Sequence, residues 1–320
     1  MIVAATDSEY RFVTQPEHAT QVGQFAHRWG NDTFADPTPK PPVAMAAALH
    51  DAGWADYDLA PHLVDGAPAG FLDTTPEEWI AFYDHGIEVV TERDPYAGLL
   101  CAMHGAGVRR GRYGTSDAHE VVEAFAAFVD AQEARQRALV DHLVADDHDA
   151  ARVTTTDREV LEDLHAGRDP DAESGVFRNY RLLQVWDRLS LYCCDAAAHE
   201  AATIGAVPVA PGVPDVGLSV VPVDETTFAL DPFPFDDSPV STRVRTRTVA
   251  RDAFAPEDDA ALVRAYHAVP VDTVRFRFVD CSADAGGLRQ LLVHLLPSRE
   301  PKRPSTPVVN PSSFHRKPGV

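Results

Sequence analysis

Apolar residues alternate with polar ones at the start of the chain and then take helical spacing. Residues 1–15 hold two short apolar runs, 1–3 and 10–13, on either side of the polar turn 7–9. This pattern predicts a small β-hairpin. Pro16 suits the first turn of a helix, and the segment after it carries an apolar face through Val22, Phe25 and Trp29. We therefore expect a helix over about residues 16–29.

The next apolar segment carries no charge. After Pro41 and Pro42, residues 43–49 read Val-Ala-Met-Ala-Ala-Ala-Leu, and the segment ends in His50-Asp51-Ala52-Gly53. A helix that is apolar on every side is a buried helix. Gly53 stands where a glycine commonly terminates a helix, so we expect the helix to end there.

Helical periodicity continues to about residue 200, and strand-like runs rich in Val and Thr follow it. The pattern predicts further helices at 76–92, 95–104, 117–145, from the capping-box pattern Thr156-x-x-Glu159 onward, and at 175–200. It predicts strands at 216–223, 226–230, 242–249 and 273–279. We expect a helical domain over 1–204, a strand-rich extension over 205–298 packed on it, and a proline-rich flexible tail over 299–320.

Composition narrows the classes of protein. The 320 residues are 45% hydrophobic and 24% charged, which is an ordinary globular balance, and the formal net charge is −21. Such a surface repels phosphate backbones, so we expect no nucleic-acid partner. The basic residues include only three lysines, Lys40, Lys302 and Lys317. A salt-loving host with an acidic proteome and an arginine-favouring, GC-rich genome both account for this pattern.

The sequence also favours a protein of the cytoplasm. It has no run of 18 apolar residues and no basic, apolar leader at its start, so we expect neither a membrane span nor secretion. The four cysteines, Cys101, Cys193, Cys194 and Cys281, form no Cys-x-x-Cys pair, which argues against disulfides and against a thiolate zinc site.

Candidate chemistry begins with His50-Asp51, at the end of the uncharged helix. A carboxylate in an apolar setting needs a counter-charge, hydrogen bonds or a metal ion. Imidazole and carboxylate together bind divalent iron, manganese and zinc. In the alternative interpretation, Asp51 hydrogen-bonds to nearby backbone and His50 fills space. Asp187 adds to the first interpretation, because its helical neighbours Leu183 and Leu191 are both apolar and its face should be buried.

The order His18, His50-Asp51, His85, His104, Asp187 resembles the ligand order of the HD-domain metal-dependent phosphohydrolase superfamily. The resemblance covers about residues 15–200 and implies an HD-like helical bundle: a mainly α fold, α+β overall once the hairpin and the extension are added. It implies that His18, His50, Asp51 and Asp187 bind one metal ion, that His85 and His104 complete a second position, and that Asp51 is catalytic. Trp54 departs from the superfamily pattern, in which many members carry Lys at that position.

A second resemblance covers most of the chain. Several segments are similar to an uncharacterised family known as DUF3891: residues 1–3, 15–18, 29–31, 50–54, 94–100 and 232–235. This family implies no established activity.

A basic segment follows His104 directly. Residues 105–112 contain three glycines and the arginines Arg109, Arg110 and Arg112, in a chain that is otherwise strongly acidic. As a loop, it could clamp an anionic substrate through backbone amides and guanidinium groups. The alternative is a solvated turn whose arginines pair with surface carboxylates. The segment does not match a nucleotide-binding fingerprint.

These observations together lead to an expected function and two rivals. We expect a metal-dependent hydrolase that uses one or two divalent ions (Fe, Mn, Zn or Mg) on a phosphate ester of a small molecule or nucleotide. The first rival is a di-iron oxygenase of the HD type, acting on a polyol or phosphonate. The second is a non-catalytic protein that binds metal or senses a small molecule.

Overall fold

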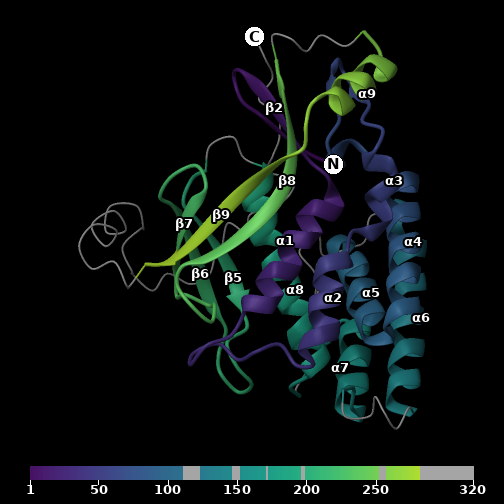
Figure 1. Ribbon diagram of the computed structural model, residues 1–320. Helices are drawn as coiled ribbons and strands as arrows, with labels where there is room; N and C mark the ends of the chain where they lie inside the picture. The colour runs from purple at the N-terminus through teal and green to yellow at the C-terminus, as the bar shows by residue number, and fades with distance from the viewer. Residues whose placement is uncertain (111–122, 146–151, 171, 196–198, 252–256, 282–320) are drawn as a thin grey trace.

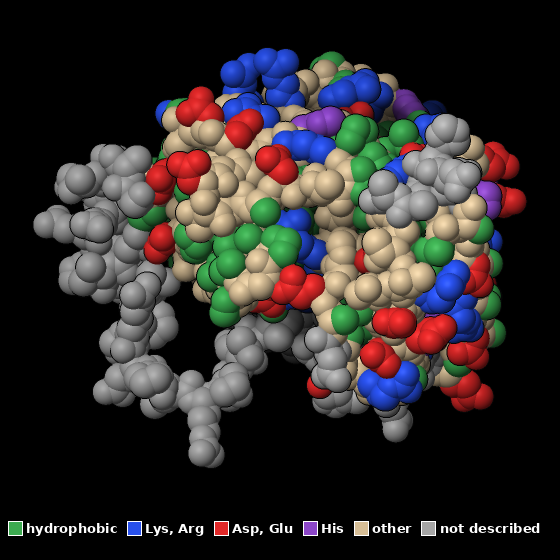
Figure 2. Space-filling model, turned by 90° about the horizontal axis from the view of Figure 1, so that it is seen from below, with side chains coloured by type: hydrophobic (Ala, Val, Ile, Leu, Met, Phe, Trp, Pro, Cys, Tyr) green, Lys and Arg blue, Asp and Glu red, His purple; other side chains and the backbone are tan. Residues whose placement is uncertain are grey.

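The computed structural model shows an α+β protein in which helices pack on one side of a curled sheet (Figure 1). It describes residues 1–110, 123–145, 152–170, 172–195, 199–251 and 257–281. The predicted tail, 299–320, lies outside these residues, as do residues 117–122 of one predicted helix. In the described part of the chain, no helix is both long enough and apolar enough to cross a membrane. Acidic and basic side chains are interspersed over the face shown in Figure 2.

The seven-stranded sheet has the order β1-β2-β8-β9-β7-β6-β5. Neighbouring strands are antiparallel except β7 and β9, which run parallel. The strands are β1 (Ile2–Ala5), β2 (Glu9–Val13), β5 (Ala202–Val207), β6 (Val216–Pro222), β7 (Thr227–Asp231), β8 (Val240–Ala250) and β9 (Asp272–Asp280). The predicted hairpin is confirmed as β1–β2, and the four predicted later strands are present as β6 to β9.

Strands from the two ends of the chain belong to the same sheet. Residues Glu9–Phe12 of β2 pair with Arg247–Ala250 of β8. Helix and sheet side chains also share one core, in which the ring centroids of Phe25 and Phe278 lie 5.1 Å apart. The predicted boundary at residue 204 lies inside strand β5.

The helices agree closely with the helical periodicity. They are α1 (Gln15–Arg28), α2 (Lys40–Leu49), α3 (Ala55–Asp58), α4 (Pro76–Arg93), α5 (Pro95–Arg109), α6 (Glu123–Ala145), α7 (Thr155–Ala166), α8 (Gly175–Asp195) and α9 (Asp259–Ala268). Side-chain caps fix several starts: the Thr14 hydroxyl accepts the Glu17 N–H, and the Asp94 carboxylate accepts the Ala97 N–H.

Three local predictions are wrong. The capping box of α7 is Thr154 with Asp157, two residues before the predicted pair. Helix α5 continues to Arg109, beyond the predicted end at residue 104. Helix α2 ends at Leu49, and Gly53 lies in a 3-10 turn (Ala52–Trp54) without a positive φ. Gly53 is needed for space, because a Cβ there would lie 1.8 Å from the Phe82 carbonyl oxygen.

The layers place the site in the interior. Helices α1 and α8 pack directly on the sheet, α2 and α5 form the next layer, and α4 and α6 lie outermost (Figure 1). Five elements were not predicted: the short helix α3, strand β5, helix α9, which packs against β8, and the two strands of a small hairpin, β3 (Leu63–Val64) and β4 (Ala67–Pro68). The functional candidates lie where α1, α2, α5 and α8 meet.

Candidate metal centre

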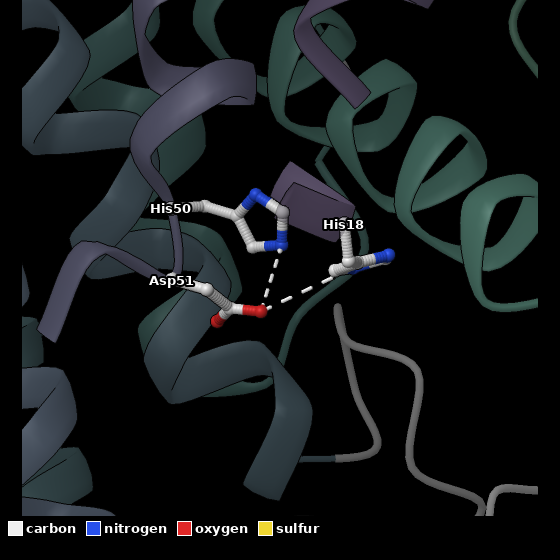
Figure 3. Close-up of side chains that lie close together, drawn as sticks. All are labelled: His18, His50 and Asp51. Atoms are coloured by element: carbon white, nitrogen blue, oxygen red, sulfur yellow. Dashed lines mark ion pairs between the residues drawn. The ribbon is translucent and has the colours of Figure 1, made fainter. Parts of the chain in front are cut away.

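Five side chains of metal-ligand type converge in the helical layers. His18 lies in the first turn of α1, His50 caps the end of α2 and Asp51 follows it, His104 lies in α5, and Asp187 is in the middle of α8. All five are buried, with 1% to 8% of their surface exposed. Donor atoms of His18, His50 and Asp51 all lie within 4.8 Å of one another, and so do those of His50, His104 and Asp187. Figure 3 shows His18 and His50 directed at the Asp51 carboxylate.

The spacing of four donor atoms fits a shared cation. His18 Nε2 lies 2.9 Å from Asp187 Oδ1 and 4.0 Å from Asp51 Oδ2. His50 Nε2 lies 3.3 Å from Asp51 Oδ2 and 3.5 Å from Asp187 Oδ1. Donors bound at about 2.1 Å to one ion are about 3.0–3.4 Å apart when adjacent, and about 4.2 Å apart when opposite. The four distances lie within about 0.2 Å of the values expected around a single metal ion, and the 2.9 Å distance is also that of a hydrogen bond.

The ring of His50 is oriented for ligation. Its Nδ1 lies 2.9 Å from the Ala47 carbonyl oxygen, which can only accept, so Nδ1 carries the proton of this hydrogen bond. Its Nε2 is buried and has no hydrogen-bond partner. A buried nitrogen whose lone pair faces two carboxylate oxygens is costly without a proton or a cation between them. In the metal-free protein a proton lies at this position, and a bound metal ion would take its place.

Asp51 is held by a second residue. The Tyr83 hydroxyl, on α4, donates to Asp51 Oδ1 over 3.1 Å, and Asp51 Oδ2 faces His50 and His18. Partners of this kind orient ligands and tune their basicity. In the alternative interpretation, Asp51 hydrogen-bonds to nearby backbone at the end of α2 and His50 only fills space. That interpretation does not explain these contacts.

His104, on α5, packs against the same cluster of ligand-type side chains. Its ring centroid is 4.8 Å from that of His50, and its Nδ1 is 3.0 Å from the Gln184 side-chain amide. Burial, together with the neighbouring His50, lowers the pKa of His104 to about 4. His104 is therefore neutral at physiological pH, as a ligating imidazole must be.

The charges in the cluster are strongly coupled. Burial acts to lower the pKa of His50, but Asp51 and Asp187 outweigh it and hold this pKa well above its ordinary value of 6.5. Burial acts to raise the pKa of Asp187, but the contacts of its carboxylate with His18 and His50 hold it well below its usual range. The pKa of Asp51 is lowered as well, by His50 and His18 against the effect of burial. Both carboxylates are therefore ionised at neutral pH.

The structure does not bring every predicted site residue to this point. His85 is exposed on α4 and belongs to neither group of ligand-type residues. Arg110 forms an ion pair with Glu133, 2.5 Å between Nη1 and Oε1, and donates to the His165 carbonyl oxygen. Arg112 lies outside the described residues. Gly105 and Gly107 are buried within α5 and do not form the predicted loop.

Arg109 is held between aromatic rings. Its Cζ lies 4.1 Å from the ring centroid of Trp79 and 4.0 Å from that of Phe125. Its Nε is buried without a hydrogen-bond partner. The Trp79 ring in turn packs on Tyr83, with centroids 4.1 Å apart, and Tyr83 holds Asp51. Two residues, Trp79 and Tyr83, thus lie between Arg109 and Asp51.

Sequence reasoning missed the polar residues that support the ligands. These include Tyr83, Gln184, Gln21 and Ser190, all buried. Gln21 follows His18 by three residues, Ser190 follows Asp187 by three and Gln184 precedes it by three. Residues three apart share a helix face, so a search for polar residues on the ligand faces could have found these three. Tyr83 lies on α4, far from Asp51 in the sequence, so no spacing along one helix pointed to it.

Comparisons with known proteins assign the chain to a family but do not identify its site. No curated protein and no solved structure matches it. No comparison links the chain to the HD-domain superfamily, so that resemblance depends on the ligand order alone. A family model described as "Protein of unknown function (DUF3891)" matches residues 1–251, and the chain therefore belongs to this family.

Proposed function

We propose that this cluster binds one divalent metal ion and that the protein is a metal-dependent hydrolase of a phosphate ester. The observation that carries the proposal is the pair of overlapping donor groups, His18–His50–Asp51 and His50–His104–Asp187, which share His50 and its Nε2 directed at both carboxylates. The ligand order of the HD-domain superfamily supports it further.

Charge and donor type narrow the choice of ion. The two carboxylates bring a charge of about −2 into a buried site, which a divalent cation balances. Three imidazoles among five donors favour manganese, iron or zinc over magnesium, because magnesium prefers oxygen ligands. His85 is exposed, and the two donor groups, His18–His50–Asp51 and His50–His104–Asp187, overlap at His50. We therefore assign one position to His18, His50, Asp51 and Asp187, with His104 beside it.

The catalytic role belongs to Asp51 in this proposal. A bound divalent ion polarises a phosphoryl oxygen and lowers the pKa of water toward ~7. Asp51 is ionised, and its Oδ2 faces the cluster while Tyr83 fixes its Oδ1. This carboxylate would orient the attacking water through Oδ2, and Tyr83 would keep it from rotating away.

The partner that we propose is a small anionic substrate, with Arg109 as its positive contact. The two flanking rings hold the guanidinium group in place, so little side-chain entropy is lost when an anion binds. Arg110 is engaged with Glu133, so we assign it a structural role.

Replacing Arg109 with alanine should raise KM for a phosphate ester without changing metal content. Loss of one charge-assisted hydrogen bond costs about 1.5–3 kcal/mol, or roughly ten- to a hundred-fold in KM. Steady-state kinetics and elemental analysis measure the two quantities. Arg93→Ala, at an exposed position on α4, is the matched control. Equal KM values for the Arg109 and Arg93 variants would exclude Arg109 from substrate binding.

Metal binding should stabilise the protein more at pH 8.5 than at pH 6. In the metal-free protein, the raised pKa of His50 contributes stability that is fully present below pH 6.5 and is lost as the pH rises through the folded-state pKa. A metal ion must displace the His50 proton, so protons compete with it at low pH. The shift in Tm caused by MnCl₂, measured across this range, should therefore grow with pH. A shift that falls with rising pH would contradict the assignment.

The proposed activity is tested with the metal-loaded protein on a panel of phosphomonoesters and nucleotides. We expect release of inorganic phosphate that is lost in Asp51→Asn and kept in His85→Ala. Oxygen consumption by the iron-loaded protein, with no phosphate release, would favour an oxygenase. Bound metal with neither reaction would favour a binding or sensing role.

A further inference from the structure

We propose that Thr242, Gln21 and Ser190 form a hydrogen-bond relay that keeps a proton on His18 Nδ1 and so leaves His18 Nε2 to the metal ion. Through this relay, strand β8 of the sheet positions a ligand of the helical site. The inference rests on the proposed metal site, which it extends to the sheet.

The relay runs through three elements in an unbroken chain of contacts. Gln21 Nε2, on α1, lies 2.8 Å from Thr242 Oγ1 on β8. Gln21 Oε1 lies 2.7 Å from Ser190 Oγ on α8, and Ser190 Oγ lies 2.7 Å from His18 Nδ1 on α1. All four residues are at most 1% exposed. Buried polar groups of this kind fix a single arrangement because each has few other partners.

Each proton in the relay can be assigned by counting donors. The Gln21 amide donates from Nε2 to Thr242, so its carbonyl Oε1 is left to accept. Two donors converge on Oε1: the Ser190 hydroxyl at 2.7 Å and the Cys194 thiol at 3.5 Å. Ser190 has a single hydroxyl proton, and it is directed at two oxygen acceptors, Gln21 Oε1 at 2.7 Å and the His18 carbonyl oxygen at 3.3 Å.

It follows that Ser190 Oγ accepts from His18, and that His18 Nδ1 carries a proton. His18 Nε2 is then the nitrogen left to the cluster, where it lies 2.9 Å from Asp187 Oδ1, and a metal ion would replace the proton of that hydrogen bond. His50 reaches the same arrangement by a shorter route, since its Nδ1 donates to the Ala47 carbonyl oxygen. Both imidazoles therefore present Nε2 to the same point, as ligating histidines with an oriented second nitrogen do.

The relay gives the sheet a function in the site. Thr242 points inward from β8, between the buried Val240 and Val244, while the alternate residues Arg243 and Arg245 are exposed. A hydroxyl at position 242 thus replaces an apolar side chain that the alternation would otherwise put there. Thr246 occupies the same inward face of β8, is also buried, and has no contact with Gln21 among the hydrogen bonds of the described residues. It provides the matched control.

The first test reads the proton directly in metal-free protein with ¹⁵N-labelled histidine. The His18 resonances are identified by their absence in His18→Gln. We expect a protonated Nδ1 in the wild type and in Thr246→Val, and an unprotonated Nδ1 in Ser190→Ala. Thr242→Val should shift the Nδ1 resonance in the same direction. An unprotonated Nδ1 in the wild type, or no change in Ser190→Ala, would overturn the relay.

The second test measures the dissociation constant for Mn²⁺ by titration. Ser190→Ala should weaken binding by about 10–100-fold, and Thr242→Val by about tenfold, the usual effects of losing a partner of a metal-ligating histidine. Thr246→Val should bind as the wild type does. Wild-type affinity in Ser190→Ala and Thr242→Val would contradict the relay alone. Absence of Mn²⁺ binding in the wild type would contradict the metal site, and the resonance of Nδ1 would still decide the relay.

Discussion

Asparagine in place of Asp187 is expected to remove the bound metal, with the metal content falling from about one ion per chain to near zero. The change keeps the size of the side chain but removes one of the two negative charges that offset a buried divalent ion. Asp187 Oδ1 is also the oxygen that lies between both histidines, 2.9 Å from His18 Nε2 and 3.5 Å from His50 Nε2. Loss of an outer partner alone costs about 10–100-fold in affinity, so loss of this ligand should cost more.

Elemental analysis and Mn²⁺ titration of the folded variant measure this effect. His85→Ala serves as the control because His85 is exposed on α4, and its metal content should equal that of the wild type. Retention of the metal in Asp187→Asn, or its loss in His85→Ala, would contradict the ligand set.

Alanine at Gly53 is expected to destabilise the protein by about 4 kcal/mol or more, in the range of the most disruptive core substitutions. An added Cβ would lie 1.8 Å from the Phe82 carbonyl oxygen and 2.9 Å from the Gly86 backbone nitrogen, so α4 would have to move. Helix α4 carries Tyr83, whose hydroxyl holds Asp51. Any variant protein that still folds should therefore also bind metal more weakly.

Urea unfolding followed by circular dichroism measures the first of these effects. Gly175→Ala is the control, because an added Cβ there meets no atom within 4 Å and the backbone has an ordinary φ. We expect its stability to stay within about 1 kcal/mol of the wild type. A similarly small effect at Gly53 would show that the 3-10 turn and α4 do not approach as closely as described.

Local patterns predicted most of the helices and strands, but long-range pairing had no local signal. The uncharged segment 43–49 and the alternation over 242–249 each correspond to an element that buries the expected residues. The pairing of β2 with β8 joins residues more than 230 positions apart, and nothing in either run specifies this partner. Helix α9 covers only a small part of β8 and contributes few buried residues, so its periodicity was weak.

The five clustered residues are all among those that the ligand order named, whereas His85 does not join them. His85-Gly86 and His104-Gly105 are the same dipeptide in sequence, yet only His104 is buried in the cluster. The buried stripe of α4 passes through Trp79, Tyr83, Gly86, Ile87 and Val90, and His85 lies off it. Helix α5 is buried on all sides from Tyr96 to Gly107, so a histidine at any position there faces the interior. Comparing the apolar positions of the two helices would have distinguished the exposed His85 from the buried His104.

The most direct test of the central claim is a crystal structure of the protein purified with Mn²⁺ at about pH 8, with anomalous scattering data collected at the metal edge. We expect one ion per chain, at about 2.0–2.2 Å from His18 Nε2, His50 Nε2 and one carboxylate oxygen each of Asp51 and Asp187. The absence of an anomalous peak at this cluster, with Mn²⁺ in excess, would contradict the account.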